Sequence, residues 1–332
     1  MSAWSKLKWP LIALAVALAF NAFFTKGFLE FNVRDGRLYG SVIDILNRAA
    51  PVMLLSLGMT LVIATGGVDL SVGAVMAITG ASAALLLTKA NLSVPPVIEL
   101  SLAIALPLAI ACVAGLWNGV LVGIFKVPPI VATLILMVSG RGVAQLLTGG
   151  QIITFENHSF EFIGRGALAG LPFTITIVLV VWAVLTFFKQ RTAAGLFIEC
   201  TGDNETASRY AGLHTSAVKL AVYAICSLCA GIAGLIVTTD IKAADANNAG
   251  LWLELDAILA TVIGGTALTG GRFFLAGSLL GAVLIQTLTT TILTRGIAVE
   301  LTLVVKAVVV LLVCLLQSEK FRALFLSRKA AA

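Results

Sequence analysis

The chain is a succession of apolar segments, each about as long as a bilayer is thick, separated by short polar stretches. A helix needs about 20 residues to cross the hydrocarbon core, where every backbone polar group has to be bonded inside the protein. Hydrophobic residues make up 59% of the 332 residues and charged residues only 11%, whereas a soluble domain carries about 25% charged residues. The sequence therefore predicts an all-α, polytopic membrane protein.

We expect about ten transmembrane helices in a single domain, residues 1–332. No small-residue cleavage site follows the first apolar run, so we expect that run to be retained as a span. The net charge of +6 is interpreted as a signal of topology and of attraction to anionic lipid, not to nucleic acid, and the excess of lysine and arginine predicts that both termini are cytoplasmic. The predicted spans are residues 11–24, 49–65, 74–88, 97–123, 130–147, 172–188, 217–238, 257–268, 273–293 and 300–316.

The longest polar interruption, residues 189–216, lies on the predicted cytoplasmic side and contains the pattern of one short helix. Asn204 can cap its first free N–H groups, and Glu205 lies at the positive end of the helix dipole. Arg209 is one turn beyond Glu205, and Gly212 can adopt the left-handed conformation that ends a helix.

A helix of about two turns is marginal by itself in water. The predicted helix therefore requires support from outside the membrane, and Arg209 and Tyr210 are of the residue types that dominate protein contacts. The alternative is a solvated loop that only joins two spans.

Two glycine-rich stretches resemble each other: Thr65-Gly-Gly-Val-Asp-Leu-Ser-Val-Gly73 and Ile263-Gly-Gly-Thr-Ala-Leu-Thr-Gly-Gly271. Each follows a span that arrives from the outer side and precedes one that returns. This similarity suggests an internal repeat with interrupted helices, as in many transporters. The candidate helix breaks are Gly66, Gly67, Gly264 and Gly265.

Asp69 and Ser71, in the first of these stretches, are candidates for a translocation path. For Asp69 a helix cap or a surface acid at the cytoplasmic rim is an equal alternative. Two further candidates, Glu254 and Asp256, lie in the outer segment that precedes the eighth span.

Two basic residues lie inside predicted spans, where a charge is expensive unless it finds a partner or reaches the interface. Lys306 is about two turns from the outer end of its span, so we expect its ammonium group to extend to the interface. For Arg141, a functional and a structural role are both open.

The motifs of several enzyme classes are missing from the sequence. No Gly-Lys dipeptide occurs, so the chain has no phosphate-binding loop of the Walker type and we expect it not to hydrolyse ATP by itself. The chain has two histidines, both in predicted loops, and most of its five cysteines lie inside apolar runs. We therefore predict no catalytic residues, no metal site and no cofactor.

Several motifs together resemble the permease subunits of the ribose/galactoside branch of carbohydrate ABC importers. The similarity extends over nearly the whole chain, and the outer segment looks most like that of the galactofuranose permeases. The residues that carry it are 47–77, Gly115-Leu-Trp-Asn-Gly119, Ala132-Thr-Leu-Ile-Leu-Met137, Gly202-Asp-Asn-Glu-Thr-Ala-Ser-Arg-Tyr-Ala-Gly212, 244–258 and 264–272.

This resemblance implies a permease in the bacterial inner membrane that transports a galactofuranose-like sugar. Its expected partners are a second permease, identical or homologous, a tandem-domain ATPase that binds the ATP, and a periplasmic sugar-binding protein. In that family the Glu-x-x-x-Arg-x-x-Gly loop, here Glu205, Arg209 and Gly212, is the coupling helix that docks in the ATPase. Independently of the resemblance, four side chains within the predicted spans can face a sugar hydroxyl, although such residues more often hold helices together: Trp117, Asn118, Gln145 and Gln286.

Three alternatives are kept. The same importer class can carry a pentose such as arabinose or ribose. An ion-coupled secondary carrier would need acidic or histidine relays at mid-bilayer, and apart from Asp69 at a span end we find none. A membrane enzyme acting on lipid-linked sugar would need a nucleophile or a metal cluster, which the sequence does not show.

Overall fold

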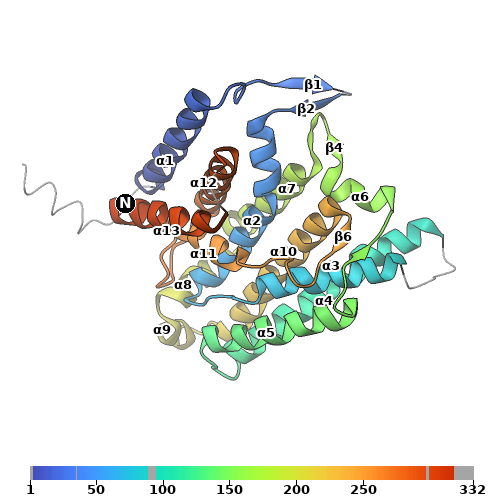
Figure 1. Cartoon of the computed structure of the whole chain (residues 1–332). Coiled ribbons are helices and arrows are strands. Elements are labelled where there is room, and N and C mark those ends of the chain that lie inside the picture. The colour runs from blue at the N-terminus through green and yellow to red at the C-terminus, as the bar shows by residue number, and fades with distance from the viewer. Residues whose placement is uncertain (1–2, 35, 89–94, 297–298, 318–332) are drawn as a thin grey trace, which may run out of the picture.

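The structure, a computed structural model, describes residues 3–34, 36–88, 95–296 and 299–317, and these are almost entirely helical (Figure 1). The predicted cytoplasmic ends, before residue 3 and after residue 317, lie outside the described residues. The longer helices are α1 (Ala3–Phe24), α2 (Ser41–Ala64), α3 (Val72–Thr88), α4 (Pro96–Gly123), α5 (Pro129–Thr148), α7 (Phe173–Arg191), α10 (Thr215–Ile241), α12 (Leu275–Thr294) and α13 (Val299–Gln317). The shorter ones are α6 (His158–Arg165), α8 (Ala194–Asp203), α9 (Glu205–Tyr210) and α11 (Leu253–Ile263).

Each of the ten predicted spans overlaps one helix. Seven helices in the described part of the chain are long and apolar enough to cross a membrane: α1, α2, α4, α5, α7, α10 and α12. Helix α3 is shorter, with 17 residues, and α11 has only 11. The chain is thus a polytopic all-α membrane protein, whereas the count of ten spans stays a prediction.

Helix α2 begins at Ser41, well before the predicted start of the second span at residue 49. The sequence between residues 26 and 48 is polar, but Ile43 and Ile45 are buried, so the first turns of α2 have an inner face. Hydropathy alone does not detect such a half-polar extension, because its charged residues lie on the other face of the helix.

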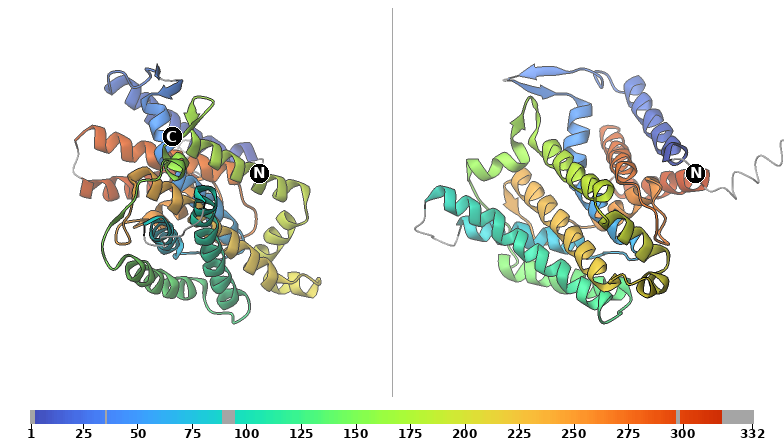
Figure 2. Two further views of the ribbon diagram at one scale, coloured as in Figure 1. Left: turned by 90° about the vertical axis from the view of Figure 1, so that its right-hand side faces the viewer. Right: turned by 180° about the vertical axis from the view of Figure 1, so that it is seen from behind.

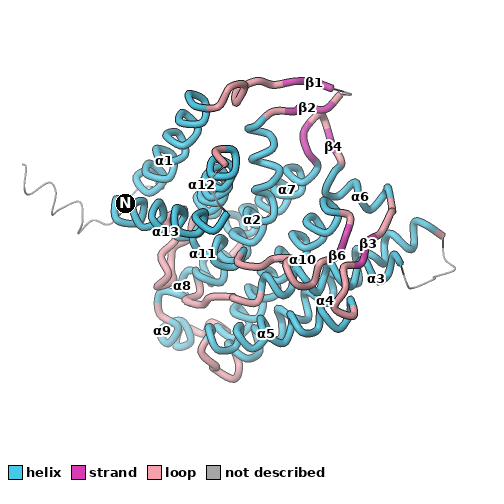
Figure 3. Tube along the Cα trace, in the orientation of Figure 1, coloured by secondary structure: helices cyan, strands magenta, loops and turns pink. Residues whose placement is uncertain are grey.

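Six strands form three short antiparallel pairs, all at one end of the molecule, which we call the hairpin end (Figure 3). Helices α8 and α9 lie at the opposite end, which we call the α9 end. The pairs are β1 (Asn32–Arg34) with β2 (Arg37–Tyr39), β3 (Ile153–Thr154) with β6 (Ala243–Ala244), and β4 (Ala167–Leu168) with β5 (Leu171–Pro172).

Helices α2, α3 and α10 form the core, and α4 and α5 pack outside them (Figure 1). Seen from behind, α4 runs beside α10, whereas α1 lies at one side against α12 and α13 (Figure 2). The close approach of α4 and α10 depends on small residues. A Cβ atom on Gly115 would lie 2.5 Å from the carbonyl oxygen of Tyr223, and one on Gly119 would lie 2.7 Å from the Cα atom of Leu220. The small-xxx-small pattern of α4 therefore marks a helix contact.

Candidate functional site

The polar segment 189–216 forms two helices, α8 and α9, instead of the single short helix predicted. They meet at Asn204, whose Oδ1 accepts a hydrogen bond of 2.9 Å from the backbone N–H of Ala207. The left-handed conformation predicted for Gly212 is present, with φ +87°. The sequence located both ends of α9 but not α8, whose N-cap residue, Ala193, has no capping side chain.

Glu205, the first residue of α9, binds three cations of the same chain. Its carboxylate pairs with Lys126 Nζ at 2.8 Å, with Lys219 Nζ at 2.7 Å and with the guanidinium of Arg209. Partial burial would raise the pKa of Glu205, but the hydrogen bonds and charges of Lys126 and Lys219 outweigh it and lower the pKa to about 2. Glu205 therefore holds α9 against the link between α4 and α5 and against the start of α10.

Arg209 and Tyr210, the two predicted contact residues, differ in their surroundings. Arg209 is bound within the chain, since its Nε donates to Thr215 Oγ1 at 2.9 Å and its fork pairs with Glu205. Tyr210 is 91% exposed. A large aromatic side chain that is almost fully exposed on a rigidly held loop is available to a partner.

The two glycine-rich stretches come together beside Gly202, the second-last residue of α8. The N–H of Gly271 donates to the carbonyl of Ala64, at the end of α2, over 2.9 Å. A Cβ atom on Gly202 would lie 1.8 Å from that same carbonyl oxygen and 2.6 Å from the nitrogen of Gly271. We call Ala64, Gly202, Gly270 and Gly271 the Gly202 junction.

The predicted helix breaks coincide with helix ends. Helix α2 ends at Ala64, and Gly66 follows with φ +77°; α11 ends at Ile263, and Gly265 follows with φ +89°. Gly264 packs against the backbone of α12, because a Cβ there would lie 2.4 Å from the carbonyl carbon of Gly277. The internal repeat itself stays a prediction.

The structure brings Asp69, Ser71 and Asn118 together in a fully buried cluster. Asp69 Oδ1 accepts from the backbone N–H of Ser71 at 3.0 Å and from its hydroxyl at 2.6 Å. Asn118 Nδ2 donates to Ser71 Oγ at 2.9 Å and more weakly to Asp69, at 3.4 Å. Asp69 is therefore not a surface acid, and its carboxylate bonds to Ser71, the residue just before α3. A Cβ atom on Gly67 would lie 2.5 Å from the hydroxyl oxygen of Tyr223.

Arg141 ties the segment between α10 and α11, which we predict to be on the outer side, to α5. Its Nη1 donates to the carbonyl oxygens of Ala246 at 3.1 Å and Ala249 at 2.5 Å. The same segment packs on α3, where a Cβ atom on Gly73 would lie 2.6 Å from Glu254 Oε2. These contacts anchor Arg141 within the protein and place Glu254 where α3 and α11 meet, whereas a role of either residue in a translocation path stays a prediction.

Lys306 and Asp256 form an ion pair, with Nζ 2.8 Å from Oδ2 and side-chain exposures of 12% and 13%. The expectation that Lys306 extends to the interface was wrong, because a carboxylate on α11 is available inside the protein. A paired charge is not exposed to the full desolvation penalty of an isolated one.

Sequence reasoning missed Lys126 and Lys219 as partners of Glu205. Both lie at the ends of predicted spans, on the same predicted side of the membrane as the polar segment. This common side could have indicated them as partners of Glu205. Among the described residues no group of three or more histidine, cysteine or acidic side chains is positioned to bind a metal.

Comparison with known proteins gives one family and several full-length relatives. The family described as "Branched-chain amino acid transport system / permease component" matches residues 41–314. The chain is 51% identical to the galactofuranose transporter permease protein YtfT of Escherichia coli K12, over 95% of this chain and 92% of that protein. It is 37% identical to the fructose import permease protein FruF of Bifidobacterium longum, over 98% and 91% of the two chains. It is 34% identical to the ribose import permease protein RbsC of Escherichia coli K12, over 96% and 95%.

Proposed function

Because the chain belongs to the family of branched-chain amino acid transport system permease components, we propose that it is the membrane permease of an ATP-driven sugar importer. The observation that carries this proposal is similarity over nearly the whole chain to permeases named for galactofuranose, fructose and ribose. The chain is a transport component in a bacterial inner membrane and it crosses that membrane several times. The comparisons give no support to an ion-coupled carrier.

The proposed cargo is a monosaccharide of the galactofuranose type. Identity is 51% to the galactofuranose permease and 34% to the ribose permease. A pentose such as arabinose or ribose remains the alternative cargo. The sugar is delivered by a binding protein on the outer side, and a second permease, identical or homologous, completes the path.

A separate tandem-domain ATPase, which binds the ATP, is the proposed partner of α9. Two features of the loop support this role: Glu205 fixes α9 to the link between α4 and α5 and to α10 through Lys126 and Lys219, and Tyr210 projects outward. Because the loop is held by these ion pairs, it would move as a rigid body with an ATPase bound to it. The orientation that follows places the α9 end and both termini in the cytoplasm.

In the proposed cycle, ATP closes the paired nucleotide-binding domains and the docked loop follows them. The spans then rock, so that the path opens outward and afterwards inward. The Gly202 junction joins the loop to both interrupted helices, which gives this movement a direct route into the bundle. No covalent bond of the sugar changes.

The test is reconstitution of the permease in vesicles with candidate ATPase and binding proteins. ATP-dependent accumulation of radiolabelled sugar, measured for galactose, arabinose, ribose and fructose, is expected only with the matching binding protein. Accumulation without nucleotide would overturn the proposal.

Replacing Tyr210 with alanine is expected to reduce sugar-stimulated ATP hydrolysis without lowering thermal stability, because the side chain contacts solvent. Replacing Glu205 and Arg209 together is expected to abolish sugar-stimulated hydrolysis while the permease stays in the membrane. Normal uptake by both variants would show that α9 is not the coupling element.

A further inference from the structure

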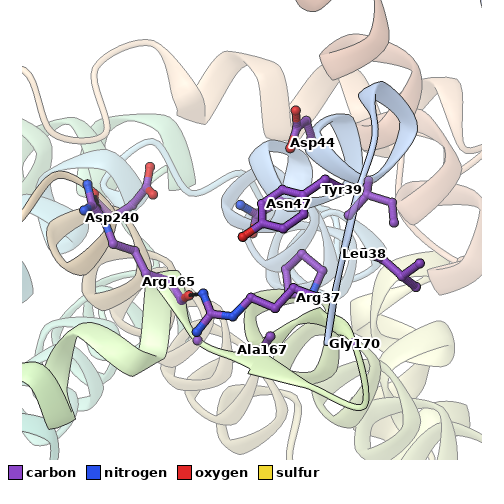
Figure 4. Close-up of a pocket in the computed structure, with 13 residues that line it drawn as sticks. Arg37, Leu38, Tyr39, Asp44, Asn47, Arg165, Ala167, Gly170 and Asp240 are labelled. Atoms are coloured by element: carbon purple, nitrogen blue, oxygen red, sulfur yellow. Dashed lines mark hydrogen bonds between the residues drawn. The ribbon is translucent and has the colours of Figure 1, made fainter. Parts of the chain in front are cut away.

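Two cavities open at the hairpin end, and the side chain of Asp44 lines both, but Arg37, Asn47 and Arg165 of the first cavity are already hydrogen-bonded. The first, of about 200 Å³, lies between α2 and the hairpins (Figure 4). Arg37 reaches across it, and its Nη1 donates to the carbonyl of Arg165 at 3.2 Å. Arg165 in turn donates from Nε to the carbonyl of Asp240 at 2.7 Å. These arginines join loops to one another, so we assign this cavity a structural role.

The second cavity, of about 360 Å³, lies between α1, α2 and α12. Its volume is in the range typical of small-molecule sites. Its wall is held by Asn21, whose Nδ2 donates to Thr291 Oγ1 at 2.6 Å and to the carbonyl of Ala17 at 2.9 Å. The wall is thus fixed by groups that are already satisfied.

The side chains of Asp44 and Arg48 also line this second cavity, but unlike Asn21 they form no hydrogen bonds to other described side chains or carbonyl groups. They lie one turn apart on α2, and neither forms a side-chain hydrogen bond or ion pair within the described part of the chain. Gln286 and Thr290 line the opposite wall on α12, where Gln286 Nε2 makes only a long contact of 3.4 Å with Thr290 Oγ1. The cavity therefore offers a carboxylate, a guanidinium, an amide and a hydroxyl to a ligand.

These groups suit a neutral, polyhydroxylated ligand. A sugar hydroxyl both donates and accepts, so it can bond to a carboxylate, which only accepts, and to a guanidinium, which only donates. Charge-assisted hydrogen bonds are also the stronger ones. Among the described residues that line the cavity there is one acid and one base, so their charges balance and an ion of either sign has no net attraction.

We propose that the cavity between α1, α2 and α12 is a sugar-binding site of the translocation path, in which Asp44, Arg48, Gln286 and Thr290 bind the hydroxyl groups of the cargo. This inference rests on the proposed function. The cavity lies at the hairpin end, opposite α9, which is where a sugar released by a binding protein would arrive.

The test uses the full importer in vesicles, with four single variants: Asp44→Asn, Arg48→Gln, Gln286→Met and Thr290→Val. Loss of a hydrogen bond to a charged group is expected to lower the maximal rate of sugar uptake about tenfold or more. ATP hydrolysis stimulated by the sugar-loaded binding protein is expected to continue, because none of these residues lies near α9. The matched control is Thr289→Val, whose hydroxyl bonds to its own helix at the carbonyl of Ile285, 2.9 Å away.

Wild-type uptake by all four variants would overturn the inference while leaving the proposed function intact. Failure of the wild-type importer to accumulate any of the four sugars would instead count against the proposed function. A second readout does not depend on transport: a cysteine at position 290, in a chain without its native cysteines, is labelled with a membrane-impermeant maleimide. Labelling from the outside that galactose slows supports the site. If galactose leaves the labelling rate unchanged, the inference is contradicted.

Discussion

Lys306 on α13 and Asp256 on α11 form an ion pair of 2.8 Å, although 50 residues separate them in the chain. Both side chains are largely buried. The pair joins the last described helix to the shortest of the helices that overlap predicted spans.

Lys306→Met is expected to destabilise the protein strongly, because it leaves the Asp256 carboxylate buried without a partner. Removing one member of a buried pair typically costs about 3–5 kcal/mol, whereas replacing both by apolar residues is close to neutral. The double variant Asp256→Leu with Lys306→Met is therefore the control and should recover most of the loss. Thermal unfolding in detergent measures both. Equal destabilisation of the single and double variants would contradict the pairing.

The fold of the α9 loop is expected to weaken in acid. The pKa of Glu205 is depressed from its ordinary value of 4.5 to about 2. The stabilisation from its ion pairs is therefore complete above about pH 4.5 and is lost as the pH falls toward 2. Cleavage of the loop by pepsin should rise over this range. In Glu205→Gln, which lacks the charge at every pH, the loop should be more sensitive throughout, and this variant also corrects for the protease's own pH dependence.

Gly202→Ala is expected to disrupt the Gly202 junction. The added Cβ would lie 1.8 Å from the carbonyl oxygen of Ala64, and backbone atoms have little room to give way. We expect a lower melting temperature and loss of sugar-stimulated ATP hydrolysis. The control is Gly142→Ala on α5, where a Cβ meets nothing within 4 Å and where alanine favours the helix by about 0.5–1 kcal/mol. If both variants behave alike, the junction is not tightly packed.

Arg141→Lys is expected to loosen the outer segment while keeping the charge. A guanidinium group presents several donors in a fixed plane and can bond to the carbonyls of Ala246 and Ala249 together, which a lysine ammonium does less well. Faster cleavage between residues 245 and 252 by a protease added from outside should follow. Ser139→Ala is the control, because the Ser139 hydroxyl bonds only to its own helix, at the carbonyl of Ile135.

Features encoded by neighbouring residues were predictable. The cap of Asn204 and the left-handed conformation of Gly212 follow from local backbone chemistry, and the structure has both. The small-xxx-small spacing of Gly115 and Gly119 is a local signal of the same kind, because it can be read from the sequence alone and it marks the contact of α4 with α10.

Features that join distant segments were not predictable in the same way. The partner of Lys306, Asp256, lies on another helix. The sequence around Lys306 does not reveal this pair, so exposure at the membrane interface was the simpler prediction. The predicted second span begins at residue 49, so Asp44 and Arg48 fall outside it, whereas α2 begins at Ser41 and places both at a cavity that α12 also lines.

The contacts at Gly202 are made by backbone atoms of three separate segments, so no side-chain rotation can absorb a displacement there. A displacement of α8 is therefore expected to move the end of α2 and the loop after α11 with it. Under the proposed function, α2 and α11 would therefore move together, and not one after the other, when the ATPase closes.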